Sequence, residues 1–279
     1  MSWAGHGRTP ESRSAHFSFE MTMTKTLLTL ALAAAASLPA QAALTAGDIA
    51  IIGRINNGAP DSFVFVALND IAAGEVIYFT DNGWTGSAFR GSSATDGDGN
   101  ENLTRWTATA TVSAGTIISS LSSSFTVSGA IAGSTSGAYN SLSLSQTGDQ
   151  IYAFQNSNTS NPLFNTATQT HLFAFDDTNG FENATDSATG NITPGLTLGK
   201  TALTLPFINN TTVHVKTSVL AGPAQTKDGW LATFADPNNW ETVGGLPTGN
   251  IAVAVPEPET YALMLSGLLA VGFMARRRR

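Results

Sequence analysis

Between residues 44 and 250 the chain alternates short apolar runs with turns rich in Gly, Asn, Asp and Ser. The runs contain many β-branched and aromatic residues, and no long stretch has the periodicity of an amphipathic helix. This pattern predicts strands at 48–55, 62–67, 75–80, 104–112, 117–127, 150–154, 171–175 and 211–215. A single short helix is predicted at 228–234, ended by Pro237.

The predicted fold class is all-β, with one antiparallel β-sandwich domain over residues 43–250. Segment 62–67 alternates Phe with Val, so it predicts a strand buried on both faces. Segments 71–77 and 112–118 share a hydrophobic residue, two small residues, a Gly, a polar residue and a β-branched pair. They predict one bend made twice, which is too few repeats for a solenoid or propeller.

The chain contains no cysteine, which excludes disulfides, thiol catalysis and thiolate-bound metals. Between Ala43 and Val255 the sequence has sixteen acidic and six basic side chains, a net charge near −10. Such a body repels nucleic acid, because affinity for nucleic acid comes mainly from neutralising phosphates. We therefore expect no nucleic-acid partner.

Residues 21–42 have the features of a secretory signal peptide. Lys25 gives a basic start, residues 27–38 form an apolar run, and Ala40 and Ala42 make the small-x-small pattern of a cleavage site. Cleavage after Ala42 is expected, with the Sec secretion machinery and signal peptidase as partners.

Residues 1–20 precede this signal and contain Glu11 and Glu20, which dilute the positive charge of a leader. Met21 and Met23 are better placed as starts, so residues 1–20 are predicted to be an upstream extension from a start assigned too early. The alternative is a genuine long n-region.

Residues 251–279 have the order of a sorting signal. The triplet Pro256, Glu257 and Pro258 is followed by an uncharged apolar run at 262–275. The basic end consists of Arg276, Arg277, Arg278 and Arg279. The arginines are expected on the cytoplasmic side, which places the body outside the cytoplasm. The run is short against the roughly 17 to 25 residues of a membrane span, as suits a transmembrane helix that is held briefly and then removed.

This arrangement resembles the PEP-CTERM tail of exported proteins from Gram-negative bacteria. The resemblance implies that exosortase, a membrane enzyme, cleaves the chain near the triplet. It also implies transient anchoring in the inner membrane, followed by a place at the cell surface or in the extracellular matrix, in association with exopolysaccharide and biofilm. The alternative is an ordinary C-terminal tail anchor.

The body has a resemblance of its own, carried by the blocks 46–50, 63–67, 78–84, 148–154 and 236–240. These blocks resemble a family of exported bacterial proteins that often end in a PEP-CTERM tail. The resemblance identifies no catalytic residue. The body is also similar to the lamin-tail-like β-sandwich, in which an Ala-Gly bend introduces a strand, and this implies the same fold class.

Two acidic segments are candidate cation sites. Asp96, Asp98 and Asn100 place oxygen ligands at alternate positions between glycines, as in loops that wrap calcium, although the full EF-hand pattern is not met. Asp176 and Asp177, followed by Thr-Asn-Gly, could bind a cation or shape a turn. Calcium is the one cofactor that the sequence suggests, and a solvated turn is the alternative.

Trp84 and Trp240 follow Asn-Gly and Asn-Asn, which places them at loop edges. Aromatic rings with polar neighbours bind sugars, so both are candidate carbohydrate-binding residues. The alternative is that they pack in the core or at its rim.

Catalytic patterns are sparse. His171 and His214 lie on predicted strands, and residues 133–137 have threonine where a nucleophile elbow needs serine. The alternate threonines of 107–111 could face one side of a strand, as in ice-binding surfaces. We expect a non-catalytic exported envelope or matrix protein, with a calcium- or carbohydrate-binding module as the alternative and a hydrolase or ice-binding protein as lesser ones.

Overall fold

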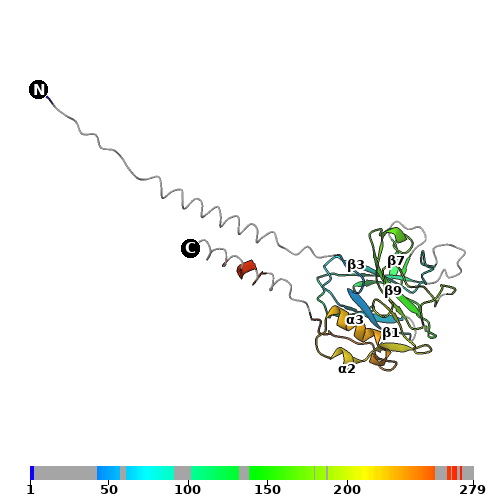
Figure 1. Cartoon of the computed structure of the whole chain (residues 1–279). Coiled ribbons are helices and arrows are strands. Elements are labelled where there is room, and N and C mark those ends of the chain that lie inside the picture. Colours follow the sequence, from blue (N-terminus) through cyan, green and yellow to red (C-terminus); the bar gives the residue numbers. More distant parts are fainter. Residues whose placement is uncertain are drawn as a thin grey trace. The chain divides into compact units, whose positions relative to one another are not determined.

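The computed structural model describes residues 1–2, 43–56, 61–90, 102–131, 138–178, 180–186, 188–254, 263–264, 266–268 and 271. The chain divides into two compact units, Met1–Ala43 and Leu44–Arg279, and all strands among the described residues belong to the second (Figure 1). The predicted signal peptide, with Ala40 and Ala42, lies outside the described residues.

One sheet has five strands in the order β13-β12-β1-β2-β5. These strands are β1 (Ile49–Ile55), β2 (Ser62–Ala67), β5 (Ile117–Ser119), β12 (Thr212–Val215) and β13 (Trp240–Glu241). All of its pairs are antiparallel. Every residue of β2 is buried, which confirms the prediction of burial on both faces.

The second sheet has six strands in the order β11-β10-β9-β3-β4-β6. They are β3 (Val76–Thr80), β4 (Leu103–Thr107), β6 (Phe125–Thr126), β9 (Gln150–Asn156), β10 (Gln169–Asp176) and β11 (Ala202–Thr204). The β10–β11 pair is parallel, so the sheet is mixed rather than purely antiparallel as predicted. The long connection between these two strands permits a parallel return, which a tight hairpin does not. A separate hairpin joins β7 (Ser128–Ala130) and β8 (Ala138–Asn140).

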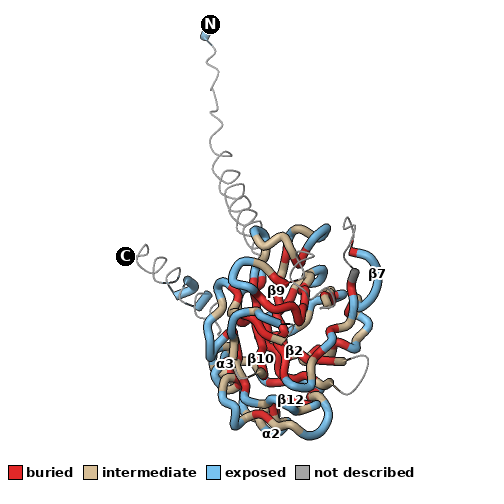
Figure 2. The backbone as a smooth tube through the Cα atoms, turned by 90° about the vertical axis from the view of Figure 1, so that its right-hand side faces the viewer, coloured by how far each residue is buried: buried red, intermediate tan, exposed pale blue. Residues whose placement is uncertain are grey.

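The two sheets share one apolar core, as a β-sandwich requires. Phe79 of β3 lies with its ring centroid 4.8 Å from Phe63 and 5.1 Å from Phe65, both on β2 of the other sheet. Phe65 also meets Trp106 of β4 at 5.3 Å, edge to face. The buried strands β2, β9 and β10 lie together at the centre of the body, with exposed loops around them (Figure 2). The prediction of a mostly β fold is confirmed.

The six-stranded sheet is buried on its outer face as well. Tyr78, Tyr152 and Phe154 alternate with core residues along their strands and belong to a second apolar cluster. Trp84 and Phe89, from the loop after β3, pack in this cluster with centroids 5.0 Å apart. Loops therefore cover this face where a third layer would otherwise be needed.

The predicted helix is present as α3 (Lys227–Ala235), and a single turn, α2 (Thr217–Leu220), precedes it. Thr226 caps α3, because its side chain accepts a hydrogen bond from Gly229 N at 3.2 Å. Trp230, Leu231 and Phe234 pack into the main core. The helix ends at Ala235, and a 3₁₀ turn, η2 (Pro237–Asn239), follows it.

Two strand predictions extend too far. The predicted strand 104–112 ends at Thr107, so the alternate threonines of 107–111 do not share one strand face. The predicted strand 117–127 divides into β5 and β6, because serines between them make a turn in which Phe125 N donates to Ser122 O at 3.1 Å.

The repeated bend is confirmed, and its two copies pair with each other. Ile71 and Val112 exchange backbone hydrogen bonds of 2.8 and 2.9 Å. Gly74 and Gly115 hold φ values of +89° and +93°, which favour glycine. One bend leads into β3 of the six-stranded sheet and the other into β5 of the five-stranded sheet, so the pair joins the two layers.

Candidate functional site

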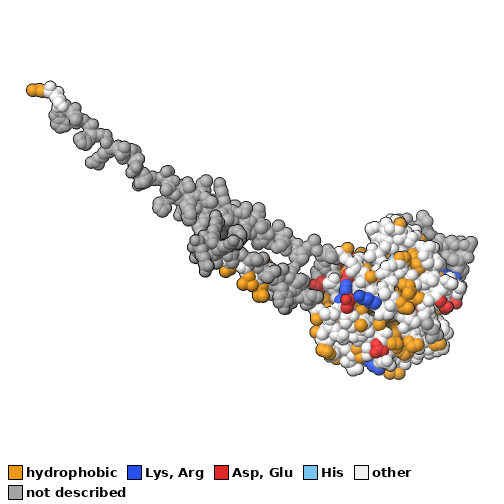
Figure 3. Space-filling view, in the orientation of Figure 1, with side chains coloured by type: hydrophobic (Ala, Val, Ile, Leu, Met, Phe, Trp, Pro, Cys, Tyr) orange, Lys and Arg blue, Asp and Glu red, His pale blue; other side chains and the backbone are white. Residues whose placement is uncertain are grey.

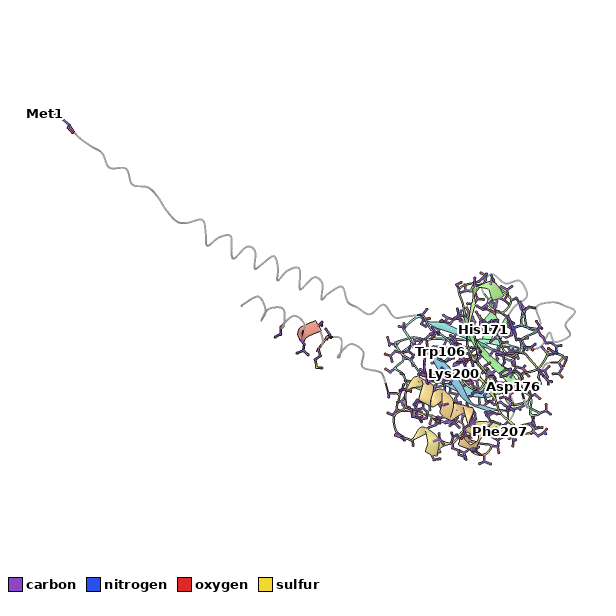
Figure 4. All side chains as sticks on the ribbon, viewed as in Figure 1. Met1, Trp106, His171, Asp176, Lys200 and Phe207 are labelled. Atoms are coloured by element: carbon purple, nitrogen blue, oxygen red, sulfur yellow. The ribbon has the colours of Figure 1, made fainter. Side chains whose placement is uncertain are left out.

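A cavity of about 600 Å³ opens beside the start of β10. Its lining is uncharged and combines apolar surface with hydroxyl, amide and imidazole groups; it consists of Thr45, Ala46, Trp84, Gly86, Ser87, Thr166, Gln169, Thr170, His171, Pro194 and Gly195. None of these described lining residues carries a formal charge at neutral pH. His171 and Asp176 lie toward opposite ends of β10 in Figure 4, and the cavity belongs to the His171 end.

Gln169 and His171 are two residues apart on β10, so their side chains point to the same face of the sheet. The Gln169 amide is oriented by two donations from Nε2, to Pro162 O at 2.8 Å and to Leu163 O at 2.9 Å. This leaves Oε1 buried without a hydrogen-bond partner among the described residues. An acceptor in that state is costly unless water or a ligand supplies a donor.

His171 is 8% exposed, and its Nδ1 also has no partner among the described residues. Its ring lies 5.2 Å from Trp84 and 6.2 Å from Phe154, between centroids. Desolvation by this burial lowers the pKa of His171 to about 4. The imidazole is therefore neutral at pH 7 and offers one nitrogen as an acceptor.

The loop that carries Trp84 is held from two sides. Asn191 donates to Trp84 O through its backbone N at 2.8 Å and its Nδ2 at 3.1 Å. Tyr152 Oη in turn donates to Asn191 O at 2.9 Å. At Gly83 a Cβ would lie 2.1 Å from Thr189 O, so only glycine fits where the two loops cross. The cavity wall is thus fixed by backbone contacts.

Of the two tryptophans predicted to bind carbohydrate, the structure brings only Trp84 to the cavity. Trp240 lies in the main core, where its Nε1 donates to Phe234 O at 2.8 Å and its ring lies 5.8 Å from Phe175. Both are 3% exposed, so neither presents an open ring face. Sequence reasoning missed Gln169 altogether, although polar residues at alternate positions at the start of an apolar strand were a signal.

The two histidines considered for hydrolysis lie in different sheets. The ring nitrogens of His214 are each 2.9 Å from a backbone carbonyl, Val215 O and Val243 O. Among the described residues no serine hydroxyl bonds to either imidazole. The absence of catalysis stays a prediction.

The acidic pair Asp176 and Asp177 shapes a turn and an ion pair. Asp177 Oδ2 lies 2.7 Å from Nε of Arg54, and both side chains are fully buried. Asp176 Oδ1 accepts from the backbone and hydroxyl of Thr178 at 2.7 and 2.8 Å. The described residues contain no group of three or more side chains suited to hold a metal ion. Asp96, Asp98 and Asn100 lie outside the described residues, so calcium there stays a prediction.

Three other aspartates, two of them buried, hold the segment before β9. Three successive backbone amides, Ser143, Leu144 and Ser145, donate at 2.6 to 2.8 Å to three different aspartates. Those aspartates are Asp81, Asp61 and Asp149. Desolvation by burial raises the pKa of Asp81 to about 6, against the effect of its backbone donors, and does the same for Asp176. This cluster is structural, and it was not predicted from the sequence, because its members are far apart along the chain.

The sorting residues Pro256, Glu257, Pro258 and Arg276–Arg279 lie outside the described residues. The described tail residues, 263–264, 266–268 and 271, are helical. Their large apolar side chains are more than half exposed. No helix among the described residues is long and apolar enough to cross a membrane.

Comparison with known families identifies residues 254–279 as a PEP-CTERM protein-sorting motif, which confirms that resemblance. The motif implies an exported protein that passes through the membrane and is processed by exosortase. No curated protein and no solved structure matches the chain.

Proposed function

With a PEP-CTERM sorting motif at residues 254–279 as the premise, we propose that this protein is a non-catalytic component of the cell envelope or extracellular matrix of a Gram-negative bacterium. Exosortase cleaves it near Pro256–Pro258, and the released body associates with exopolysaccharide. The observation that carries this proposal is the position of the motif against the end of the folded body.

The last described backbone bond of the body is the one from Ala254 N to Gln225 O, at 2.7 Å. Just before it, Ile251 N donates to Gly115 O at 2.8 Å and Trp230 Nε1 donates to Ala252 O at 2.9 Å. We call residues 249–254 the C-terminal strap. The hydrogen-bonded body thus extends past the predicted boundary at residue 250 and reaches the first residue of the motif. Cleavage beyond Ala254 breaks none of these bonds.

The described part of the tail supports transient anchoring. Leu263, Met264, Leu268 and Val271 are 58% to 70% exposed on a helical segment. Exposed apolar side chains at this density are costly in water and favourable in lipid. The four arginines that follow set the orientation by the positive-inside rule.

The surface of the body supports association with polysaccharide. Figure 3 shows a face on which Lys, Arg, Asp and Glu side chains are few, while backbone and uncharged side chains, with several hydrophobic patches among them, make up most of the surface. Hydroxyl and amide groups exchange hydrogen bonds with neutral sugars without the cost of burying a charge. The uncharged cavity beside β10, which combines apolar surface with hydroxyl and amide groups, favours a carbohydrate-binding module as the second candidate function.

Mass spectrometry of the protein from its native host, read for both termini, tests the proposal. We expect an N-terminus near Ala43 and a C-terminus within residues 255–259 in wild-type cells. The tail should persist in cells without exosortase and in a variant with Pro256, Glu257 and Pro258 replaced by alanine. An intact C-terminus through Arg279 in wild-type cells contradicts processing, and a body found only in the cytoplasm contradicts export.

A further inference from the structure

We propose that the cavity beside β10 is a binding site for a neutral saccharide, held through hydrogen bonds to Gln169 and His171. The inference rests on the proposed function for the source of this ligand, the polysaccharide around the cell. Its physical basis is the chemistry of the cavity alone.

The first step is a pair of unsatisfied polar atoms. Gln169 Oε1 and His171 Nδ1 are both buried, have no partner among the described residues, and belong to side chains on one face of one strand. A buried polar atom without a partner destabilises the fold unless a hydrogen-bonding group reaches it. A saccharide hydroxyl both donates and accepts, so it can pair with Gln169 Oε1 and with either tautomer of His171.

The second step is the absence of charge. No Lys, Arg, Asp or Glu is among the described residues that line the cavity. Burial lowers the pKa of His171 to about 4, so the histidine does not become a cation at neutral pH. A phosphate or uronate in this cavity would lose hydration without gaining a counter-charge. The lining therefore selects neutral ligands.

The third step is size and shape. A cavity of about 600 Å³ lies within the range of roughly 300–1,000 Å³ that is typical of small-molecule sites. Ala46, Pro194 and the accessible edge of Trp84 give it apolar surface for the C–H groups of a sugar ring. Because Trp84 is only 3% exposed, the ligand touches the rim of its ring and does not stack on an open indole face.

The fourth step is rigidity. The Gln169 amide is fixed by Pro162 O and Leu163 O, and the Trp84 loop is fixed by Asn191. Groups that are already immobile lose little conformational entropy when a ligand binds. The free energy of binding is therefore more favourable than it would be with mobile loops.

The test is calorimetric titration of the full chain, purified in a detergent without a sugar head group. The probes are neutral hexasaccharides of glucose, galactose and mannose, and a hexasaccharide of galacturonate is the charged comparator. We expect binding of at least one neutral probe and none of the galacturonate. Binding of the galacturonate as tight as that of every neutral probe, or no binding of any neutral probe at millimolar concentration, overturns the proposal.

Two variants test the named residues. Gln169→Met and His171→Phe keep a side chain of similar shape but remove its polar atoms, and each should weaken binding about tenfold. The matched control is Gln155→Met, because Gln155 lies on β9 and donates to Glu75 and Val76 O outside the cavity lining. Thermal unfolding of each variant checks that the fold is retained. Wild-type affinity in both cavity variants overturns the assignment of these acceptors.

The measurement of sugar binding does not depend on whether the protein is processed by exosortase. Sugar binding by the chain with its tail still attached supports the site even where exosortase processing fails. Correct processing without sugar binding leaves the proposed function standing and removes the site.

Discussion

At the scale of single residues, the buried ion pair between Arg54 and Asp177 should have a large effect on the stability of the fold. Both side chains are 0% exposed, and the closest approach of their charged atoms is 2.6 Å. Breaking such a pair by removing one charge leaves the other buried and uncompensated, at a cost of about 3–5 kcal/mol. We therefore expect Asp177→Asn to lower the free energy of unfolding by about that amount in urea titrations.

The exposed pair Lys200–Asp228 is the matched control. Its atoms approach to 3.1 Å, but its side chains are 51% and 70% exposed. Exposed pairs contribute only about 0–1 kcal/mol, so Asp228→Asn should change the free energy of unfolding little. Equal effects of the two variants would contradict the assignment of a buried, uncompensated charge at Arg54.

Asp176 gives a pH-dependent prediction. Desolvation by burial raises its pKa from the ordinary aspartate value to about 6, and its Oδ2 has no partner among the described residues. The folded state therefore holds the proton more tightly than the unfolded state, and this group's contribution to stability falls as the pH rises from about 4 to 6. Asn resembles the protonated acid in shape and stays neutral at every pH.

We expect Asp176→Asn to raise the free energy of unfolding by on the order of 1–3 kcal/mol at pH 7.5 and to change it little at pH 4. Urea titrations of wild type and variant at both pH values measure this difference. His171, whose pKa is lowered to about 4, has the opposite slope between pH 4 and 6.5, but it is present in both proteins and cancels. A variant less stable than wild type at pH 7.5 contradicts the prediction.

At the scale of elements, the twin bends at Gly74 and Gly115 offer a matched experiment. Both glycines have positive φ, so alanine at either costs about 1–2 kcal/mol in backbone strain. They differ in what a Cβ would meet. At Gly74 nothing lies within 4 Å, whereas at Gly115 the Cβ would lie 2.2 Å from Ile251 O of the C-terminal strap.

Gly115→Ala should therefore lower the free energy of unfolding more than Gly74→Ala does. The expected difference between the two variants is about 1–3 kcal/mol. Chemical unfolding of the two variants under one condition measures the difference. If the two variants lose the same stability, the close packing of the Gly115 bend against the C-terminal strap does not contribute to the free energy of unfolding, and the prediction is wrong.

Elements also show where sequence reasoning succeeds. The predicted strands with nearly continuous apolar runs, 48–55 and 62–67, match β1 and β2 almost residue for residue, because a strand that is buried on both faces requires such a run. The strands of two or three residues, such as β11 and β13, were missed. So short a segment has no periodicity to detect, and its strand conformation is set by the neighbour with which it pairs.

The residues of the candidate site likewise divide into those that could be predicted from the sequence and those that could not. Trp84 and His171 were noticed in the sequence because their side-chain types are distinctive, although His171 was weighed for hydrolysis. Gln169 was not noticed, since its relevance comes from the carbonyls of Pro162 and Leu163, which orient its amide. Relationships of this kind arise only when the loops are placed in space.

At the scale of the whole molecule, the folded body and the sorting motif meet at Ala254. This position means that the strap belongs to the folded body and remains with it after processing. Ile251 is 5% exposed in the main core, and the strap also takes part in the backbone bonds to Gly115 and Gln225. The new C-terminus left by exosortase is thereby tied to the body.

Two truncations separate these roles. A chain that ends after Ala254 should keep the stability of the naturally processed protein, because every strap bond is retained. A chain that ends after Thr248 loses the burial of Ile251, worth about 2–5 kcal/mol, together with hydrogen bonds of about 1 kcal/mol each. Its free energy of unfolding should fall by roughly 4 kcal/mol or more, and part of the population should be unfolded at 37 °C. Equal stability of the two chains would show that the body ends before the strap, and the cut would then fall in a linker rather than at the edge of the fold.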